Sequence, residues 1–311
     1  MTSPRTIVIV GPTASGKSAL ALELAGRLGD AELVSIDSMQ VYRGMDIGTA
    51  KPTADEQAGV PHHMIDVLDP SEEASVAWFQ TEALAVIDDL ERRGRRAVLV
   101  GGTGLYHRAV ADRLTIPPQF PAVRAELEAE LAATGPARFT AARYAELGDL
   151  DPVAAARCEP GNPRRIIRAL EVIRGSGRPF SSFGPGLEEY PPTDHLIVGL
   201  RVTRDDLEPR ISRRVDAMMD AGFLDEVRGL AAADPPISRT ARQALGYREL
   251  LAHLGGRCSL DAAVAETVTR TRQFAVRQDR WFRRDPRIGW LDAAAETRAS
   301  AEVILGRLDR P

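Results

Sequence analysis

A phosphate-binding loop is the strongest chemical signal in the sequence. Residues 11–18 form a complete G-x-x-x-x-G-K-[ST] pattern: Gly11, Pro12, Thr13, Ala14, Ser15, Gly16, Lys17 and Ser18. The glycines let backbone N–H groups turn towards an anion, Lys17 neutralises phosphate oxygens, and the Ser18 hydroxyl is a ligand for Mg²⁺. An apolar strand-like run precedes the loop and a helical pattern follows it, so a plain glycine turn is the weaker interpretation. We predict that this phosphate loop binds a diphosphate or triphosphate, with Mg²⁺ as cofactor.

A carboxylate follows the next apolar run. Asp37 comes directly after residues 31–36, which we expect to form the second strand of a parallel sheet, so Asp37 should lie on the same sheet edge as the phosphate loop. In a kinase with such a loop, an acid here orients an acceptor hydroxyl, whereas in an alkyl transferase it accepts a proton from an incoming amine. An aspartate that only caps the following turn remains the structural alternative.

The elements that must position these residues alternate between strand and helix. We predict strands at 6–10, 31–36, 62–68 and 97–100 and helices at 17–28 and 73–92. The wholly apolar run 97–100 is typical of a central strand buried on both faces of a parallel sheet. The predicted fold class is therefore α/β, a P-loop NTPase-like, doubly wound parallel sheet flanked by helices, with ligands at the carboxyl ends of the strands.

The pattern changes in the middle of the chain. Residues 116–193 contain only helical segments, expected at 121–133, 136–147, 151–157 and 162–175, with Pro117-Pro118 and Pro191-Pro192 near their limits. We predict an all-helical insertion domain at 116–193 that divides the core into residues 1–115 and 194–311. The second part should contain a strand at 195–202, helices up to about residue 284 and a last strand at 287–291.

Charge and composition restrict the class of protein. The formal net charge of −4 argues against a uniformly basic coat, but residues 270–287 contain seven arginines against two aspartates, and residues 157–178 contain six arginines against two glutamates. Cys158 and Cys258 show no metal-binding or disulfide pattern. No apolar stretch is long enough for a signal peptide or a membrane span, so we expect a cytoplasmic monomer with no membrane partner.

Several long motifs resemble the tRNA dimethylallyltransferase (isopentenyl-tRNA transferase) family. Besides the phosphate loop, the matching segments are 37–52, 61–66, 101–106, 162–171, 210–227, 243–247 and 271–274, which span nearly the whole chain in order. The resemblance implies transfer of a dimethylallyl group from dimethylallyl diphosphate to N6 of the adenosine immediately 3′ of the anticodon. The implied partners are this donor and the anticodon stem-loop of tRNA, with the insertion domain facing the tRNA.

The resemblance also implies roles for individual residues. Asp37 would hold and deprotonate the adenine N6 amine, and Thr13 and Arg214 would contact the donor. The implied tRNA-binding residues are Asp37, Ser38, Met39, Gln40, Thr103, Arg124, Arg164, Arg165, Arg168, Gln243, Gly246, Tyr247 and Arg272. From residue types alone, the glycines of 101–104 could serve a turn with positive φ, and the arginines of 164–168 could be a solvated helix face paired to Glu171. We expect His62-His63 to pack structurally, because no third metal ligand is evident.

Three other functions compete with this interpretation. A small-molecule kinase would use the same loop and acid, but it does not require the 37–52 segment or the basic C-terminal region. An isopentenyltransferase acting on free adenine nucleotides would not require the helical insertion. A GTPase-like RNA-binding module would need a guanine-reading N-K-x-D element, and no clear one is present.

Overall fold

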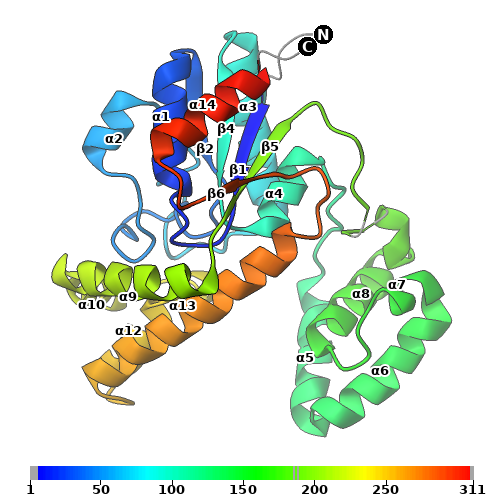
Figure 1. Ribbon diagram of the computed structural model, residues 1–311. Helices are drawn as coiled ribbons and strands as arrows, with labels where there is room; N and C mark the ends of the chain where they lie inside the picture. The colour runs from blue at the N-terminus through cyan, green and yellow to red at the C-terminus, as the bar shows by residue number, and fades with distance from the viewer. Residues whose placement is uncertain (1–5, 185, 188, 309–311) are drawn as a thin grey trace. The chain divides into compact units, whose positions relative to one another are not determined.

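Six parallel strands form one sheet in the order β3-β2-β4-β1-β5-β6 (Figure 1). The computed structural model describes residues 6–184, 186–187 and 189–308, and so the first five residues lie outside the description. The strands are β1 (Thr6–Val10), β2 (Ala31–Ser35), β3 (His62–His63), β4 (Arg96–Gly101), β5 (Leu196–Arg201) and β6 (Gly289–Asp292). The predicted α/β fold with a parallel sheet flanked by helices is confirmed.

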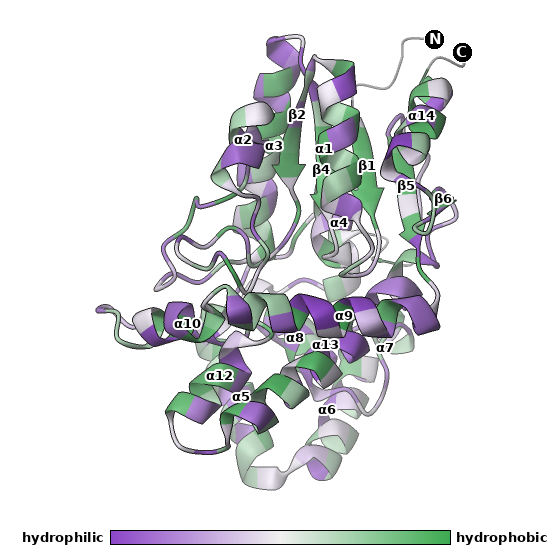
Figure 2. Ribbon diagram, turned by 60° about the vertical axis from the view of Figure 1, so that its left-hand side comes forward, coloured by the Kyte–Doolittle hydropathy of each residue, from purple (hydrophilic) through white to green (hydrophobic). Residues whose placement is uncertain are grey.

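Helices cover both faces of this sheet. Successive side chains of a strand point to opposite faces, so Ile7 and Ile9 pack with α1 (Lys17–Leu28) and α14 (Thr297–Leu308), which lie side by side. Val8 and Val10 belong to the other core, with α3 (Val76–Arg92) and α4 (Gly104–Ala111). Figure 2 shows β1, β2 and β4 as hydrophobic along most of their length. Burial on both faces explains why these strands read as continuous apolar runs.

The remaining helices of the core follow β2 and β5. They are α2 (Ala54–Gly59), α9 (Arg204–Asp220), α10 (Phe223–Ala231), α11 (Arg239–Arg242), α12 (Tyr247–Leu254) and α13 (Leu260–Phe282). Two of the predicted elements need correction. The expected strand at 62–68 pairs with β2 only at 62–63, because Met64 and Asp66 take φ values of 61° and 55° that end the extended conformation. The helix α14 follows the strand that we expected to close the chain.

The structure divides into two units, Met1–Asp112 with Pro192–Pro311 and Arg113–Pro191, where the sequence analysis placed the insertion at 116–193. The second unit contains α5 (Pro121–Thr134), α6 (Pro136–Leu150), α7 (Pro152–Ala156), α8 (Pro163–Ser176) and the short 3₁₀ helix η1 (Phe180–Phe183). Its four α-helices each begin with proline, whose fixed φ suits the first helical position. This unit has its own core around Leu127, Phe139, Leu147, Ile166 and Leu170.

A buried carboxylate ties β2 to the turn before β4. Glu32 is 4% exposed and accepts hydrogen bonds from Arg93 Nη1 at 2.9 Å and Arg95 Nε at 3.1 Å. His63 Nε2 lies 2.7 Å from the same carboxylate. The hydrogen bond from Arg93 is the main cause that lowers the pKa of Glu32 to about 2, against the opposing effect of burial. The ionised form of Glu32 is therefore favoured by folding.

We expect Glu32→Gln to lower the free energy of unfolding at pH 7 by about 3 kcal/mol, which corresponds to a pKa change from 4.5 to about 2. Because the folded-state pKa lies below the unfolded-state pKa, this contribution is complete above pH 4.5 and is lost as the pH falls towards 2. Urea denaturation should show the difference between the two proteins shrinking by about half at pH 3. A difference that stays constant with pH would contradict the assignment to charge.

Candidate active site

A cavity of about 270 Å³ opens at the carboxyl ends of the central strands. Its walls come from the phosphate loop, the 37–52 segment, the turn after β4, and helices α9 and α13. The charged side chains in these walls are Lys17, Asp37 and Arg214. The sequence analysis expected these three residues to act together, and the structure places them around one cavity.

The phosphate loop has the backbone that an anion site requires. Gly11 takes a φ of 147° and Gly16 a φ of 89°, conformations that favour glycine. A Cβ at Gly11 would also lie 2.9 Å from the carbonyl oxygen of Leu200, so the close approach of β5 excludes a side chain there. Gly16 caps the N-terminus of α1, which directs the positive end of that helix towards the loop.

Lys17 lies over the loop and is buried. Its Nζ donates to the carbonyl oxygen of Pro12 at 2.5 Å. The pKa of Lys17 is lowered to about 7, mainly by burial and also by the positive charge of Arg214, while the negative charge of Asp37 opposes both effects. Burial likewise lowers the pKa of Arg214. Two cationic side chains that line one cavity favour the binding of a polyanion there.

Asp37 has one carboxylate oxygen engaged and one directed to other uses. Its Oδ1 accepts a hydrogen bond from the N–H of Met39 at 2.8 Å, so the turn-capping alternative is correct for that oxygen. The second oxygen has no hydrogen-bond partner among the described residues, and the residue lines the cavity. The carboxylate is thus held in one orientation with one oxygen left to accept a proton.

The turn after β4 approaches Asp37 from the neighbouring strand. The N–H of Ser38 donates to Thr103 Oγ1 at 3.3 Å, which joins the ends of β2 and β4. Gly101 and Gly102 do not need positive φ. They need space, because a Cβ at Gly101 would lie 2.7 Å from the backbone of Ile36 and one at Gly102 would overlap the side-chain amide of Gln278. Close approach, not turn conformation, explains these glycines.

Gln278 is a site residue that the sequence analysis missed. It lies on α13, is 7% exposed, and its Oε1 accepts from the N–H of Thr13 at 2.8 Å. Its Nε2 donates to the carbonyl oxygen of Gly102 at 2.8 Å. A glutamine among the arginines of 270–287 gives no sign of this contact. The only signal would have been its place on the buried face of an amphipathic helix, with Ala275 and Phe282.

The 37–52 segment is held from α10. One carboxylate, that of Glu226, accepts from three consecutive N–H groups, those of Asp46 at 2.9 Å, Ile47 at 2.7 Å and Gly48 at 3.2 Å. The hydroxyl of Tyr247 donates to the same carboxylate at 2.5 Å. These hydrogen bonds hold residues 46–48 in a defined position relative to α10.

Gly246 and Tyr247, which the resemblance assigned to tRNA, are both buried in the structure. Tyr247 is 0% exposed, and its ring packs edge-on against Phe223 at 4.9 Å between ring centroids. Gly246 is buried with a φ of 84°, and a Cβ there would lie 2.6 Å from Phe223. The Tyr247 hydroxyl reaches the 37–52 segment through Glu226, and the backbone of Gly246 packs against Phe223.

Two polar residues of the 37–52 segment are also used internally. Gln40 Oε1 accepts from Ser35 Oγ at 2.8 Å, and its Nε2 donates to the carbonyl oxygens of Thr49 and Ala50 at 3.2 Å each. Lys51 is the second of the two lysines, and its buried Nζ donates to Tyr42 O at 2.8 Å and to Asp66 and Asp46. Met39 and Ser38 are half-buried beside Asp37. Lys17 is therefore the lysine left to act in the cavity.

The predicted tRNA-binding arginines divide into two groups. Arg124 and Arg168 both pair with the fully buried carboxylate of Glu171, at 3.3 Å and 3.0 Å. Arg164 and Arg165 are exposed and have no side-chain partner among the described residues. The paired-face alternative thus holds for Arg168, Arg124 pairs with the same carboxylate from α5, and Arg164 and Arg165 stay open to a ligand.

Arg272 also has protein partners. It pairs with Glu208 and donates to Ser212 Oγ at 3.3 Å, and both partners lie on α9. The guanidinium therefore links α13 to α9 in the structure as it stands.

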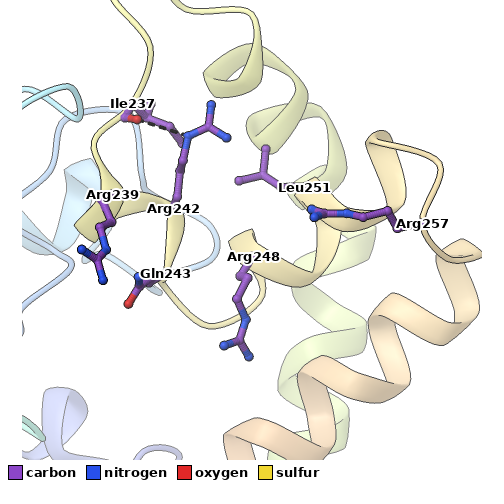
Figure 3. A pocket seen from close by; sticks show the side chains of 7 residues that line it. All are labelled: Ile237, Arg239, Arg242, Gln243, Arg248, Leu251 and Arg257. Atoms are coloured by element: carbon purple, nitrogen blue, oxygen red, sulfur yellow. Dashed lines mark hydrogen bonds between the residues drawn. The ribbon is translucent and has the colours of Figure 1, made fainter. Parts of the chain in front are cut away.

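A second cavity, of about 420 Å³, is surrounded by arginines (Figure 3). We call Arg239, Arg242, Arg248 and Arg257 the arginine cluster; Gln243 lies between Arg239 and Arg248. Arg248 pairs with Glu249 at 2.6 Å. Arg242 Nε donates to a backbone carbonyl, whereas Arg239 and Arg257 have no partner among the residues described. Of this set, the resemblance pointed only to Gln243.

The donors at the main cavity fit a magnesium ion. The exposed hydroxyl of Ser18 lines it, and Mg²⁺ binds through one or two protein oxygens together with phosphates and water. Among the described residues, no group of three or more His, Cys, Asp or Glu side chains could hold a metal, and His63 lies against Glu32. No helix in the described part of the chain has the length and apolar character of a membrane span.

Known proteins resemble this chain over nearly its whole length. A family model described as IPP transferase matches residues 40–285, and one described as isopentenyl transferase matches residues 4–67. The tRNA dimethylallyltransferase of Streptomyces avermitilis is 50% identical over 310 residues, which cover 99% of this chain and 97% of that protein. The tRNA dimethylallyltransferase of Acidothermus cellulolyticus is 52% identical over 306 residues, covering 97% of this chain and 94% of the relative.

Solved structures are similar over the same extent. The tRNA isopentenylpyrophosphate transferase of Bacillus halodurans is 40% identical with a TM-score of 0.71, and the match covers 98% of this chain and 97% of that one. A eukaryotic dimethylallyltransferase acting on tRNA is 29% identical with a TM-score of 0.77, covering 98% of this chain and 80% of that one.

Proposed function

The chain belongs to the IPP transferase family, and on that premise we propose that it transfers the dimethylallyl group of dimethylallyl diphosphate to N6 of the adenosine immediately 3′ of the anticodon in tRNA. The observation that carries this proposal is the cavity in which the phosphate loop and Lys17 face a carboxylate oxygen of Asp37 that has no partner within the described part of the chain. One side of the cavity suits a leaving diphosphate, and the other suits an amine that must lose a proton.

The phosphate loop would stabilise the leaving group. As the bond between the allylic carbon and the diphosphate oxygen breaks, negative charge grows on the diphosphate. The loop N–H groups, Lys17 and Arg214 lie where they could neutralise that charge, and Thr13 is positioned in the same wall. When bound, Mg²⁺ would add charge neutralisation, with Ser18 as its protein ligand. Ile65, Val100 and Phe274 give the cavity apolar wall for the dimethylallyl chain.

Asp37 would act on the acceptor. The lone pair of the adenine amine is delocalised into the ring, so the amine is a poor nucleophile until a base removes a proton. As the new bond forms between N6 and the allylic carbon, the free oxygen of Asp37 takes the proton and later releases it to solvent. Thr103 accepts from the N–H of Ser38, the residue after Asp37, at 3.3 Å and so helps to hold the turn that carries the base.

We assign tRNA backbone contacts to the arginine cluster and to Arg164 and Arg165. Within the described residues, the side chains of Arg239, Arg257, Arg164 and Arg165 have no partner. The arginine cluster gathers four guanidiniums against one carboxylate, that of Glu249, around a cavity wide enough for a phosphodiester. Arg164 and Arg165 on α8 carry two more exposed charges. Contacts of this kind hold the RNA in place without reading its sequence, which single-stranded bases in the anticodon loop would supply.

Arg239→Ala and Arg257→Ala are each expected to weaken binding of an anticodon stem-loop several-fold and to reduce the slope of log affinity against log salt by about one. Each removes one phosphate contact, so the effect should not depend on the sequence of the loop. Fluorescence anisotropy over a salt series measures both quantities. Arg92→Ala, which removes an arginine exposed on α3, is the control. A salt slope that equals that of the wild type would exclude these arginines from the RNA interface.

The function itself is tested by incubating the protein with Mg²⁺, dimethylallyl diphosphate and unmodified tRNA. Mass spectrometry then scores prenylated adenosine, with AMP and ATP as rival acceptors and Asp37→Ala as the inactive control. We expect product on tRNA alone. Prenylated AMP or ATP would point instead to a transferase of free nucleotides, and phosphorylation of a metabolite without prenylation would identify a kinase.

A further inference from the structure

The side chain of Gln278 connects two loops that carry opposite halves of the proposed reaction. The phosphate loop holds the leaving group, and the turn after β4 stands on the acceptor side. Gln278 accepts from Thr13 N–H and donates to Gly102 O, at 2.8 Å in both cases. Both ends of one amide are used, and the side chain is 7% exposed, so water does not compete with these bonds.

The sheet cannot fix these two loops relative to each other. Strands β1 and β4 are paired up to Val10 and Gly101, and the chain leaves the hydrogen-bonded ladder immediately after both residues. Beyond that point, Gln278 supplies the connection from the side. Gly102 leaves room for this, because a Cβ there would overlap the amide. The two hydrogen bonds of the amide thus link the two loops beyond the point where the backbone pairing of β1 and β4 ends.

The contact continues to the proton acceptor. Thr103 follows Gly102 directly, and its Oγ1 accepts from the N–H of Ser38, the residue after Asp37. A change in the position of Gly102 would therefore move the acceptor edge relative to the phosphate loop. In transfer reactions a misplacement of about 1 Å can cost about 10²-fold in rate.

We propose that Gln278 is a positioning residue that keeps the donor's allylic carbon aligned with the acceptor amine, and thereby decides whether the amine or water captures it. The inference rests on the proposed transfer to tRNA. In the misaligned site, water attacks instead. Its oxygen bonds to the allylic carbon as the carbon–oxygen bond to diphosphate breaks, and its proton passes to solvent, giving dimethylallyl alcohol and diphosphate.

The test compares diphosphate released with prenyl groups incorporated into tRNA. For the wild type we expect a ratio of about one. Gln278→Met, which keeps the length of the side chain and loses both hydrogen bonds, should lower kcat about 10²-fold and raise the ratio several-fold. Gln278→Glu keeps an acceptor for Thr13 N–H and loses the donor to Gly102 O. It should raise the ratio as well, while leaving the KM for dimethylallyl diphosphate within about twofold of the wild type.

Gln80→Met is the matched control. Gln80 Nε2 donates to Ala109 O at 2.6 Å between α3 and α4, away from the cavity, so this variant loses a comparable internal hydrogen bond. We expect it to lower the melting temperature as much as Gln278→Met and to keep the ratio near one. A ratio near one in both Gln278 variants, or an equal rise in Gln80→Met, would overturn the proposal. A wild type that prenylates no tRNA would instead overturn the proposed function, which separates the two failures.

Discussion

Asp37→Asn should lower kcat for transfer to tRNA by about 10³-fold while leaving tRNA affinity unchanged. Asparagine keeps the oxygen that accepts from Met39 N–H at 2.8 Å, so the turn after β2 should survive the change. What the variant loses is a basic oxygen in the cavity. Because the amide cannot take up the N6 proton, the loss falls on the chemical step and should appear in single-turnover rates measured with tRNA in excess.

Asp69→Asn is the matched control for this prediction. Asp69 Oδ1 accepts from the N–H of Ser71, also two residues ahead, at 2.9 Å, so it makes the same kind of turn as Asp37 without lining the cavity. Its variant should retain kcat within about twofold. If Asp37→Asn kept kcat within about fivefold of the wild type, the proton would have to be accepted by another group.

The second large effect is expected from Lys17→Met, with kcat/KM for dimethylallyl diphosphate falling by about 10³-fold. The ammonium group is buried, so solvent screens little of its attraction for the negative charge on the leaving diphosphate. The same burial gives a second, opposite effect on stability. The folded-state pKa of about 7 lies below the usual 10.5, so protonation of Lys17 opposes folding at pH values below 10.5, and most strongly below about 7.

Lys17→Met should therefore raise the melting temperature of the ligand-free protein at pH 7 while it removes activity. Lys51→Met provides the contrast. Its Nζ donates to Asp66 and to Tyr42 O, so loss of that group leaves a carboxylate and a carbonyl without their partner and should lower the melting temperature. Thermal scans with and without diphosphate measure both effects. A Lys17→Met protein less stable than the wild type without ligand would contradict the electrostatic account.

The sequence was sufficient wherever function depends on neighbours along the chain. The phosphate loop is contiguous, and Asp37 follows a strand, so the parallel-sheet rule was enough to place both at one edge. Gln278 and Glu226 instead act through contacts between segments that are far apart in the sequence. They act on Thr13 and on residues 46–48, more than 170 positions away, and no spacing in one sequence indicates such pairs. The contact of Tyr247 with Glu226 could not be predicted for the same reason, since Glu226 lies on another helix.

Local charge counts also reached their limit. They located two arginine-rich segments, but they could not separate Arg168, which pairs with buried Glu171, from Arg164 and Arg165, which face solvent. The arginine cluster escaped notice because its four arginines are spread over residues 239–257, where arginine is less dense than in the two arginine-rich segments. Whether an arginine can bind a ligand depends on which carboxylates lie beside it in the folded protein.

The position of β5 in the chain has a consequence for the order of biosynthesis. One edge of β1 pairs with β4, and the other pairs with β5, which lies beyond the helical unit Arg113–Pro191. On the ribosome, the second edge of β1 is therefore without its native partner until that whole unit has been translated, at about 5–20 residues per second. An apolar strand with an open edge is a site for pairing with other chains. The central strand of the nascent protein, next to the phosphate loop, is therefore exposed for several seconds. During this period chaperones or rapid translation must prevent aggregation.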